Sequence, residues 1–529
     1  MGDGNDTVTV SASALGTDGS IDAGDGVDTL SMTAANAVTA SASATFEASI
    51  SNFDKISLGN VAATGTVNLA NLDDINEVTV AGVAGGQVLT VSNAASGVVA
   101  NFADATQTAT TISLANAGSA DVANINLTTA DAASTHALIT LTGFETINID
   151  SADTGTGAVG TNTITTLTDA DATSINVTGN ANTSIGTFSG TKLTSYDASA
   201  ATGTTAYTTG ALAGAATLKG GSKVDTLNAA AAVAAVTMEG NAGDDVLTGS
   251  ATKANDIDGG ADDDTLTGGA AADVITGGDG TDTFVFSSAN VVEQAGSGTT
   301  NGVVINLSDA AIAQSAVFTA TGSYLTTTDT SVASNSTAYL YSNESSTNAD
   351  VNDTLSGIEN ATGTNLADYI VGSSTANTIT GGTGADYLTG GDGADTFVQA
   401  AAASVVLTAE TVTEAAIAKT ETITFGNGVD IISDFTAGSG GAKLDVQGAG
   451  GAIPTAALGS DQTANTAGTI YYLSGAFVQA TGVFTIAANG AGADTLIFEG
   501  DAGANLAAVN DAIVLVGVDS DDLAAVNFI

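Results

Sequence analysis

The chain has 529 residues, of which 57 are acidic and 7 are basic, all of them lysine, so its formal net charge is −50. This charge makes nucleic acid a poor partner and disfavours anionic membrane surfaces, because both are bound through clustered Lys and Arg; cations are the natural counter-partners. The absence of cysteine excludes disulfides and thiolate metal sites. An acidic chain with few aromatic residues often stays disordered. Here 43% hydrophobic residues and a single proline instead predict a chain that buries a core once its acids are neutralised.

The N-terminus, MGDGNDTVTV, lacks the basic region and the apolar stretch of a Sec-type signal peptide. It does contain a glycine-rich motif, MGDGNDTVT (1–9), which returns as AGDGVDTLS (23–31) with Asp6 and Asp28 at matching positions. Because the chain begins at the second residue of this motif, we expect it to be part of a longer protein, or a form that lost its N-terminal region. No apolar run approaches the ~18 residues of a membrane-spanning helix.

Residues 32–219 are rich in Ala, Thr, Ser, Asn and Val, and short strand-like runs alternate with turns of small residues. The runs recur irregularly, as in EVTVAG, TISLANA, INLTTA, ETINID and SINVTGN. This pattern predicts stacked short strands, that is, a solenoid without a strict ligand motif. An unrelated β-sandwich is the alternative.

Two later blocks have a regular period. In the first block, apolar residues follow one another at a spacing of ten residues once and nine thereafter: Leu247, Ile257, Leu266, Ile275 and Phe284. In the second block the spacing is nine throughout: Ile370, Ile379, Leu388 and Phe397. Six-residue glycine turns are thus predicted to alternate with three-residue strands.

The repeating unit is G-G-x-G-x-D-x-U-x, where U is a large apolar residue. Three copies match every fixed position: GGDGTDTFV (277–285), GGTGADYLT (381–389) and GGDGADTFV (390–398). Two copies lose the third glycine: GGADDDTLT (259–267) and GGAAADVIT (268–276). Residues 250–258 and 372–380 are weaker, with Asn255 and Asn377 replacing the aspartate, and Lys223 replaces the third glycine in GGSKVDTLN (220–228). We interpret this last copy as a degenerate repeat.

These residue types suit a calcium loop. Glycines permit backbone angles closed to other residues, so carbonyl groups can converge, and aspartate adds a hard anionic oxygen for an ion that takes 6–8 oxygens at ~2.3–2.6 Å. Each nonapeptide is predicted to form half a coil with U pointing inward, so that a loop stacks on the loop two repeats later with the ion between them. The expected stacked pairs are Asp264 with Asp282, Asp368 with Asp386, and Asn377 with Asp395. Ordinary glycine turns with solvated aspartates are the alternative.

The candidate calcium ligands are residues of these motifs, and several Ca²⁺ ions are expected. They are Asp3, Asp6, Asp25, Asp28, Asp245, Asp264, Asp273, Gly278, Asp279, Gly280, Asp282, Asp368, Asn377, Gly382, Gly384, Asp386, Gly391, Asp392, Gly393 and Asp395.

The two blocks, with TLSGIEN (354–360) and DIISDF (430–435), resemble the RTX (haemolysin-type calcium-binding) family. The order of MGDGNDTVTV, GFETINID, ATSINVTGNAN, TSYDASA and the tandem repeats is similar to the C-terminal lattice-forming region of RsaA-type bacterial surface-layer proteins. This resemblance implies export by a type I secretion apparatus through an uncleaved C-terminal signal, and calcium-dependent self-association into a lattice at the bacterial surface. A cell-surface polysaccharide would be reached through a region outside this chain. The chain departs from the pattern at 291–362.

An enzyme is not expected. The H-E-x-x-H zinc motif needs two histidines, whereas the chain has one, His136, which we interpret as an ordinary surface or strand residue. No G-x-S-x-G motif surrounds a serine. A two-carboxylate glycosidase or a lyase stays open among so many acids, although 5% aromatic residues and no Trp argue against a carbohydrate groove. An RTX adhesin or biofilm protein is the main alternative to a lattice subunit, and the non-catalytic part of an RTX hydrolase is a further one.

The predicted fold class is all-β, a right-handed parallel β-solenoid or calcium β-roll with irregular stacked short strands. Five regions are expected, in chain order: an irregular solenoid (1–219), the first calcium block (220–290), a β-rich insert (291–362), the second block (363–398), and a C-terminal β cap with the type I secretion region (399–529).

Overall fold

The computed structural model confirms the fold class: the chain is mostly β and forms a parallel β-solenoid of about 16 turns. The handedness stays a prediction. The chain divides into two compact units, Met1–Asp264 and Thr265–Ile529, which are described separately. The structure describes residues 1–73, 75–102, 108–115, 117–286, 302–313, 315–316, 324–325, 331–341, 352–399, 407–410, 422–425, 429–438, 441–446, 470–488, 490–499, 512–523 and 527–529.

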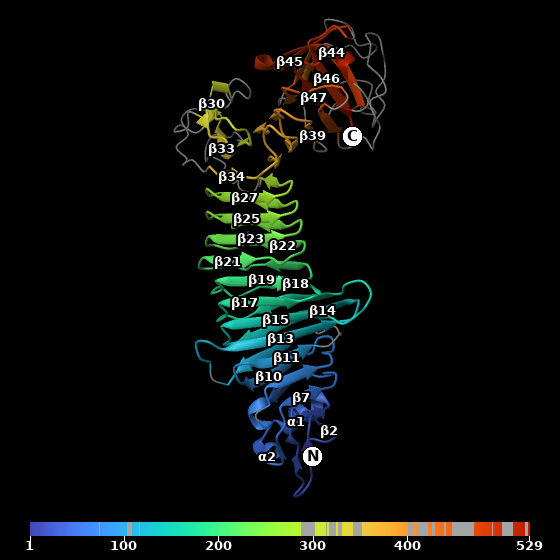
Figure 1. Ribbon diagram of the computed structural model, residues 1–529, viewed down its shortest axis with the longest axis vertical. Coiled ribbons are helices and arrows are strands. Elements are labelled where there is room, and N and C mark those ends of the chain that lie inside the picture. Colours follow the sequence, from blue (N-terminus) through green and yellow to red (C-terminus); the bar gives the residue numbers. More distant parts are fainter. Residues whose placement is uncertain are drawn as a thin grey trace. The chain divides into compact units, whose positions relative to one another are not determined.

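Unit 1 is built from two parallel sheets whose strands alternate along the chain, so that each turn adds one strand to each sheet (Figure 1). The first sheet contains β2 (Thr7–Val10), β5 (Thr29–Met32), β7 (Lys55–Leu58), β9 (Glu77–Val80), β11 (Val98–Phe102), β13 (Val122–Thr129), β15 (Thr146–Asp153), β17 (Ser174–Gly179), β19 (Ser195–Ala201), β21 (Ala216–Lys219), β23 (Val236–Ala242) and β25 (Asp256–Ala261). The second contains β8 (Gly65–Asn68), β10 (Leu89–Ala94), β12 (Thr110–Leu114), β14 (Ala133–Thr142), β16 (Thr161–Thr168), β18 (Asn182–Phe188), β20 (Thr205–Thr208), β22 (Asp225–Asn228) and β24 (Val246–Thr248).

The core of unit 1 is a set of apolar columns between the two sheets. Alternate residues of each strand point inward, as the burial pattern of β13 shows, because successive strand side chains lie on opposite faces. In register, Ile125 of β13 stacks on Ala100 of β11 and on Ile149 of β15. Tyr196 of β19 stacks on Tyr207 of β20, with ring centroids 4.0 Å apart. The solenoid predicted for 32–219 is therefore confirmed, and the β-sandwich alternative is wrong.

The first turns of unit 1 contain elements that the strand pattern did not predict. Helix α1 (Ala34–Ala40) begins after Thr33, whose side chain accepts a hydrogen bond from the Asn36 N–H, and its alanines favour the helix. Helix α2 (Ala44–Glu47) and the short helix η1 (Leu69–Asn71) follow. Two small parallel pairs, β1 (Gly2–Asp3) with β4 (Gly24–Asp25) and β3 (Ile21–Asp22) with β6 (Ile50–Ser51), complete this end.

Unit 2 contains a parallel ladder that joins parts of both nonapeptide blocks. One side is formed by β26 (Thr265–Thr267), β28 (Thr283–Val285), β35 (Asn360–Thr362), β37 (Thr378–Thr380), β39 (Thr396–Gln399) and β43 (Lys443–Val446). On the other side, β27 (Val274–Asp279) pairs with β34 (Thr354–Ser356), and β29 (Val303–Asn306), β36 (Tyr369–Val371), β38 (Tyr387–Thr389), β42 (Asp430–Ile432) and β47 (Ala512–Leu515) form a second series. The last strands of the range 291–362 therefore belong to the ladder.

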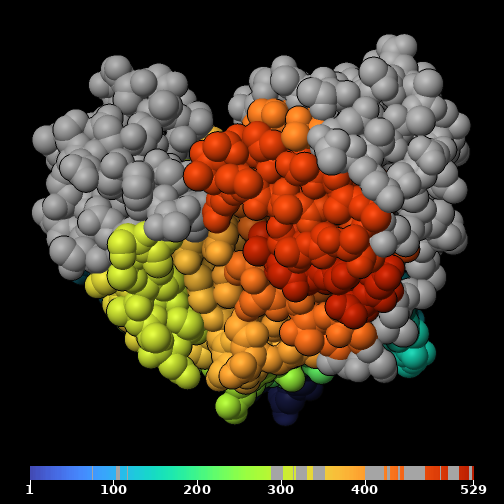
Figure 2. Space-filling view, turned by 90° about the horizontal axis from the view of Figure 1, so that it is seen from above, coloured from blue at the N-terminus to red at the C-terminus, as the bar shows by residue number. Residues whose placement is uncertain are grey.

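Antiparallel strands flank this ladder. β33 (Ser336–Tyr341) pairs with β29 and with β31 (Tyr324–Leu325), and β30 (Ile312–Ala313) pairs with β32 (Ser331–Val332). A C-terminal sheet contains β40 (Leu407–Glu410), β41 (Thr422–Phe425), β44 (Ile470–Val478), β45 (Val483–Ile486), β46 (Asp494–Glu499) and β47, with the short helices η3 (Gln479–Thr481) and η5 (Ser520–Asp522). Figure 2 shows the last of these strands, β44–β47, in red, beside the orange strands that include the second block.

Among the helices that the structure describes, each is too short or too polar to cross a membrane.

Candidate calcium-binding loops

A ladder of carboxylates runs along the ends of the glycine loops. The sixth residue of a loop lies at or directly before the start of a short strand with its side chain buried, and one of its oxygens accepts a hydrogen bond from the equivalent backbone N–H one turn earlier. Asp386 accepts from Asp368 over 2.9 Å, and Asp395 accepts from Asn377 over 3.0 Å. These contacts confirm two predicted stacks. The third, Asp264 on Asp282, would involve one residue from each unit and stays a prediction.

The loops fall into two backbone classes. In the first class, which we name open loops, the second and fourth residues both have positive φ. The open loops are 23–28, 240–245, 259–264, 277–282, 381–386 and 390–395. In the second class, the closed loops, neither position has positive φ. The closed loops are 220–225, 268–273, 363–368 and 372–377. The class follows the fourth residue, which is glycine or aspartate in open loops and Lys, Ala, Leu or Thr in closed ones.

In closed loops the sixth residue bonds back to its own loop. Oδ2 of Asp225 accepts a hydrogen bond from the Gly221 N–H, and Oδ2 of Asp273 accepts one from the Gly269 N–H. Oδ2 of Asp368 accepts from the Thr364 N–H, while its Oδ1 accepts from the Val303 N–H over 2.7 Å. Both oxygens of such a carboxylate are thus already held by donors.

In three of the open loops the second oxygen of the sixth residue is left over. Asp28, Asp245 and Asp386 are at most 1% exposed, and each gives Oδ1 to the ladder. Among the described residues, Oδ2 of these three side chains meets no hydrogen-bond donor. A buried carboxylate oxygen without a donor costs free energy unless a cation compensates it. These three open loops therefore have the oxygen that a hard cation needs.

In the open loop 381–386, glycine is required by close approach as well as by φ. A Cβ added to Gly381 would lie 2.2 Å from Oδ2 of Asp386, so the first glycine makes room for the carboxylate. A Cβ on Gly382 would lie 1.8 Å from the carbonyl oxygen of Thr364, and one on Gly384 would lie 2.4 Å from that of Leu366. The second and fourth glycines therefore bring two stacked loops backbone to backbone, with carbonyl oxygens turned toward them.

The electrostatics of the ladder also favour a cation. Burial raises the pKa of Asp245 and Asp368 to about 7, and raises the pKa of Asp395 to about 6. Burial raises the pKa of Asp386 well above its ordinary value, and the neighbouring Asp430 and Asp368 carboxylates raise it further. A bound Ca²⁺ reverses this effect, because an adjacent positive charge favours the ionised carboxylate.

The two N-terminal motifs stack directly on each other. Both are far from the two nonapeptide blocks in the sequence. β1 pairs in parallel with β4, and β2 with β5. The Gly4 N–H donates to the Asp25 carbonyl over 2.6 Å, and the Asp6 N–H donates to Oδ1 of Asp28 over 2.7 Å. Gly4 and Gly26 have φ of 119° and 147°. The loop at 1–6 thus lies on an open loop, which the sequence did not predict.

The predicted ligands divide by loop position. Third-position aspartates are exposed: Asp3, Asp25, Asp279 and Asp392. Sixth-position residues are buried, apart from the half-buried Asp6: Asp28, Asp245, Asp264, Asp273, Asp282, Asp368, Asn377, Asp386 and Asp395. Of the predicted glycines, Gly278, Gly280, Gly382, Gly384, Gly391 and Gly393 all have positive φ.

Sequence reasoning missed other carboxylates of the same ladder. Oδ1 of Asp353 accepts from the Asp273 N–H over 3.0 Å, Oδ1 of Asp430 accepts from the Asp386 N–H over 3.0 Å, and Oε2 of Glu359 accepts from the Asp282 N–H over 2.9 Å. An acid directly before a short apolar strand, as in NDTLS and GVDII, is the signal that could have found Asp353 and Asp430.

Side chains alone do not form a metal site in the part of the chain that the structure describes, where no three His, Cys, Asp or Glu side chains gather at ligand distances. The donors that fit a cation are the sixth-position carboxylates of the open loops and backbone carbonyls of the stacked loops. This all-oxygen set suits Ca²⁺, which accepts carbonyl ligands, and it holds an ion by joining one turn to the next.

His136, the one histidine, is fully buried in β14. Its ring lies 3.4 Å from the Ser134 hydroxyl and is tilted against Phe102, and burial lowers its pKa from 6.5 to about 4. It is a strand residue, as predicted, but not a surface one.

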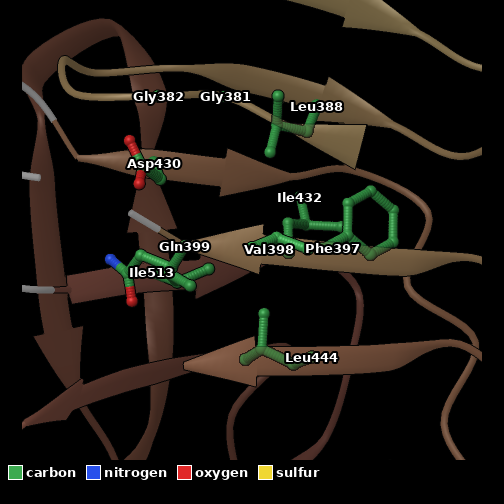
Figure 3. A pocket seen from close by; sticks show the side chains of 10 residues that line it. All are labelled: Gly381, Gly382, Leu388, Phe397, Val398, Gln399, Asp430, Ile432, Leu444 and Ile513. Carbon is green, nitrogen blue, oxygen red and sulfur yellow. The ribbon is translucent and has the colours of Figure 1, made fainter. Parts of the chain in front are cut away.

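A small hollow lies beside the open loop 381–386 (Figure 3). Leu388, Phe397, Ile432 and Leu444 come to it from adjacent strands, and Asp430 and Gln399 add polar groups. Its lining is the solenoid interior rather than a row of converging reactive groups.

Comparison with known families agrees with this geometry. The chain matches the RTX calcium-binding nonapeptide repeat, in 4 copies, at residues 237–253, 252–284 and 362–397. No curated protein matches the chain. The chain therefore contains RTX calcium-binding nonapeptide repeats within its β-solenoid, and such repeats imply Ca²⁺ binding. Proteins with these repeats are typically secreted.

Proposed function

We propose that the chain is a secreted structural protein, a subunit of a bacterial surface-layer lattice whose folding and assembly depend on Ca²⁺. The observation that carries this proposal is the ladder of buried carboxylates beside open glycine loops. A protein that needs a cation at successive turns folds where calcium is abundant, outside the cell. In this proposal the chain has no catalytic role.

Charge and shape together support self-association. A net charge of −50 makes copies of the chain repel one another, and bound Ca²⁺ lowers that repulsion as it folds the loops. The solenoid offers regular outward rows, such as Thr66, Thr90, Thr111 and Thr140, which follow one another in register. The resemblance to surface-layer proteins supports the remaining partners, a type I secretion apparatus and a cell-surface polysaccharide reached through a region outside this chain.

An RTX adhesin or biofilm matrix protein is the second candidate. It is favoured by the antiparallel strands β30–β33, which follow β29 and leave the parallel ladder, as an inserted binding module would. The non-catalytic part of a secreted RTX hydrolase is a third candidate.

Electron microscopy of the purified chain separates these candidates. With millimolar calcium we expect a periodic two-dimensional sheet, which chelation by EDTA disperses. Isolated rods with calcium would contradict the lattice proposal and favour the adhesin. Purified chain with magnesium in place of calcium is the control, and it should give no sheet, because Mg²⁺ demands octahedral geometry and keeps its waters.

A further inference from the structure

The open and closed loops differ in what their buried carboxylates still need. Asp28 and Asp273 are both at most 1% exposed, and both belong to the ladder. Oδ2 of Asp273 is held by the Gly269 N–H of its own loop. Oδ2 of Asp28 meets no donor in the described chain. Two loops of nearly the same sequence pattern therefore have opposite requirements for a cation.

We propose that the fourth residue of each loop decides whether it binds calcium: open loops, including 23–28 with the N-terminal loop 1–6 stacked on it, hold Ca²⁺, whereas the sixth residue of a closed loop is not a ligand. This inference rests on the calcium-dependent function proposed above and assigns it loop by loop. It adds a site outside the segments that match the RTX family. It also removes Asp273, Asp368 and Asn377, which lie inside those segments, from the ligands.

The fourth residue acts through its backbone angle. Positive φ strains Ala, Leu, Thr and Lys. Gly adopts positive φ freely, and Asp and Asn adopt it at a lower cost than the other residues do. At Ala271 and Leu366 the loop therefore takes negative φ, the second residue turns its N–H toward the carboxylate, and the loop closes. Asp262 stands where a glycine is expected, and it has φ of 77°, so its loop stays open.

The open loop 23–28 is in backbone contact with the loop 1–6, in which Gly4 but not Gly2 has positive φ. The carbonyl oxygens of Gly2 and Gly4 lie 2.3 and 2.1 Å from where a Cβ on Gly24 and Gly26 would be. These two turns are thus in backbone contact, as the loops at 364–366 and 382–384 are. The carboxylate of Asp28 and carbonyls of both loops would hold the ion.

The first test counts calcium ions bound to the full chain, by native mass spectrometry at saturating calcium. Asp28→Asn should lose one ion relative to wild type. The matched control Asp273→Asn, equally buried and equally isosteric, should keep the wild-type number. Loss of an ion from Asp273→Asn, or an unchanged number in Asp28→Asn, would overturn the inference. Wild type that binds no calcium would instead refute the proposed function itself.

A second test leaves every sixth-position carboxylate in place. Asp262 is exposed, and its φ of 77° suits glycine but not alanine. Asp262→Ala should close the loop 259–264 and raise the calcium midpoint of folding about tenfold. Asp262→Gly should keep the wild-type midpoint and ion count, although both variants lose the bond from the Gly243 N–H to the Asp262 carboxylate. Equal behaviour of the two variants would show that the angle of the fourth residue does not control binding.

Discussion

The middle turns of unit 1 and the glycine-loop turns share one architecture, a ladder of parallel strands in two sheets. The interactions that stabilise the turns differ between the two regions. In the middle, Asn148 and Asn176 occupy equivalent places 28 residues apart. In the second block, Asp368 and Asp386 are 18 residues apart. The longer turns contain strands such as β14 and β16, with ten and eight residues, against three in β37 and β38.

In the proposed function, this difference explains why the glycine-loop turns would need an ion and the middle turns would not. A strand of three residues places one side chain in the core, so β37 buries Ile379 and little else. A strand such as β13 buries Ala123, Ile125 and Leu127 together. At about 25 cal/mol per Å² of buried apolar surface, the short turns gain much less on folding. They also bury a carboxylate at each open loop, so the cation supplies both the missing stability and the missing charge.

The largest expected effect is that of calcium removal, and it should divide the two regions. In EDTA, hydrogen exchange of β26–β28 and β35–β39 should approach that of an unfolded chain, while β11–β19 stay protected. Circular dichroism should show a sharp rise in β content with millimolar calcium and none with magnesium. Equal exchange in both regions would break the comparison.

Next in size is the loss of one ladder carboxylate. Asp386→Ala removes an ion ligand and also the acceptor of the Asp368 N–H. The lost ligand should raise the calcium midpoint of folding at least tenfold, about 1.4 kcal/mol, and the buried N–H left without an acceptor adds ~1–3 kcal/mol. Asp519→Ala, in the exposed cap of η5, is the control. Equal midpoints would mean that the sixth-position aspartates are not ligands.

Much of the fold followed from sequence period alone. The nine-residue spacing placed Ile370, Ile379, Leu388 and Phe397 in the core, and all four are buried. It also predicted that Asp368 and Asp386 are stacked partners. The ladder between the blocks could not be predicted, because Asp273 stacks on Asp353, 80 residues later, and no local period spans such an interval.

The division into open and closed loops could not be predicted from the sequence for a different reason. A missing glycine looks the same at Asp262 and at Ala271, but only Asp tolerates positive φ, so one loop is open and the other closed. Likewise, Asp6 and Asp28 were recognised as ligand types, whereas their stacking depends on how the intervening residues form β3 and the rest of the first turn.

In the middle region of unit 1, a lower pH should reduce the stability of the fold, whereas calcium should not affect it. Burial lowers the pKa of His136 from 6.5, its ordinary value, to about 4 in the folded chain, so the unfolded chain binds the proton first as pH falls. The buried neutral histidine therefore costs no stability above pH 6.5. Between pH 6.5 and pH 4 it lowers the free energy of unfolding progressively, by about 1.4 kcal/mol at pH 5.5. Hydrogen exchange of β13–β16 at pH 7.5 and 5.5, corrected for intrinsic rates, measures the loss. The His136→Gln variant should lack the part of the stability loss that comes from the histidine. An equal loss in both chains would contradict the assignment of that loss to His136.

The smallest expected effect concerns the polar rows outside the middle sheets. The Asn148 amide donates to Oδ1 of Asn124 and accepts from Nδ2 of Asn176, both over 2.9 Å. Asn148→Ala breaks both bonds at half-buried positions, where water replaces part of each, so the expected loss is about 1 kcal/mol. Thr163→Ala, an outward position of β16, is the matched control and should cost less. The measurement is the urea midpoint of the middle region in EDTA, where the calcium loops no longer contribute. A loss of several kcal/mol would mean that the amide row, rather than the apolar columns, holds the calcium-free turns together.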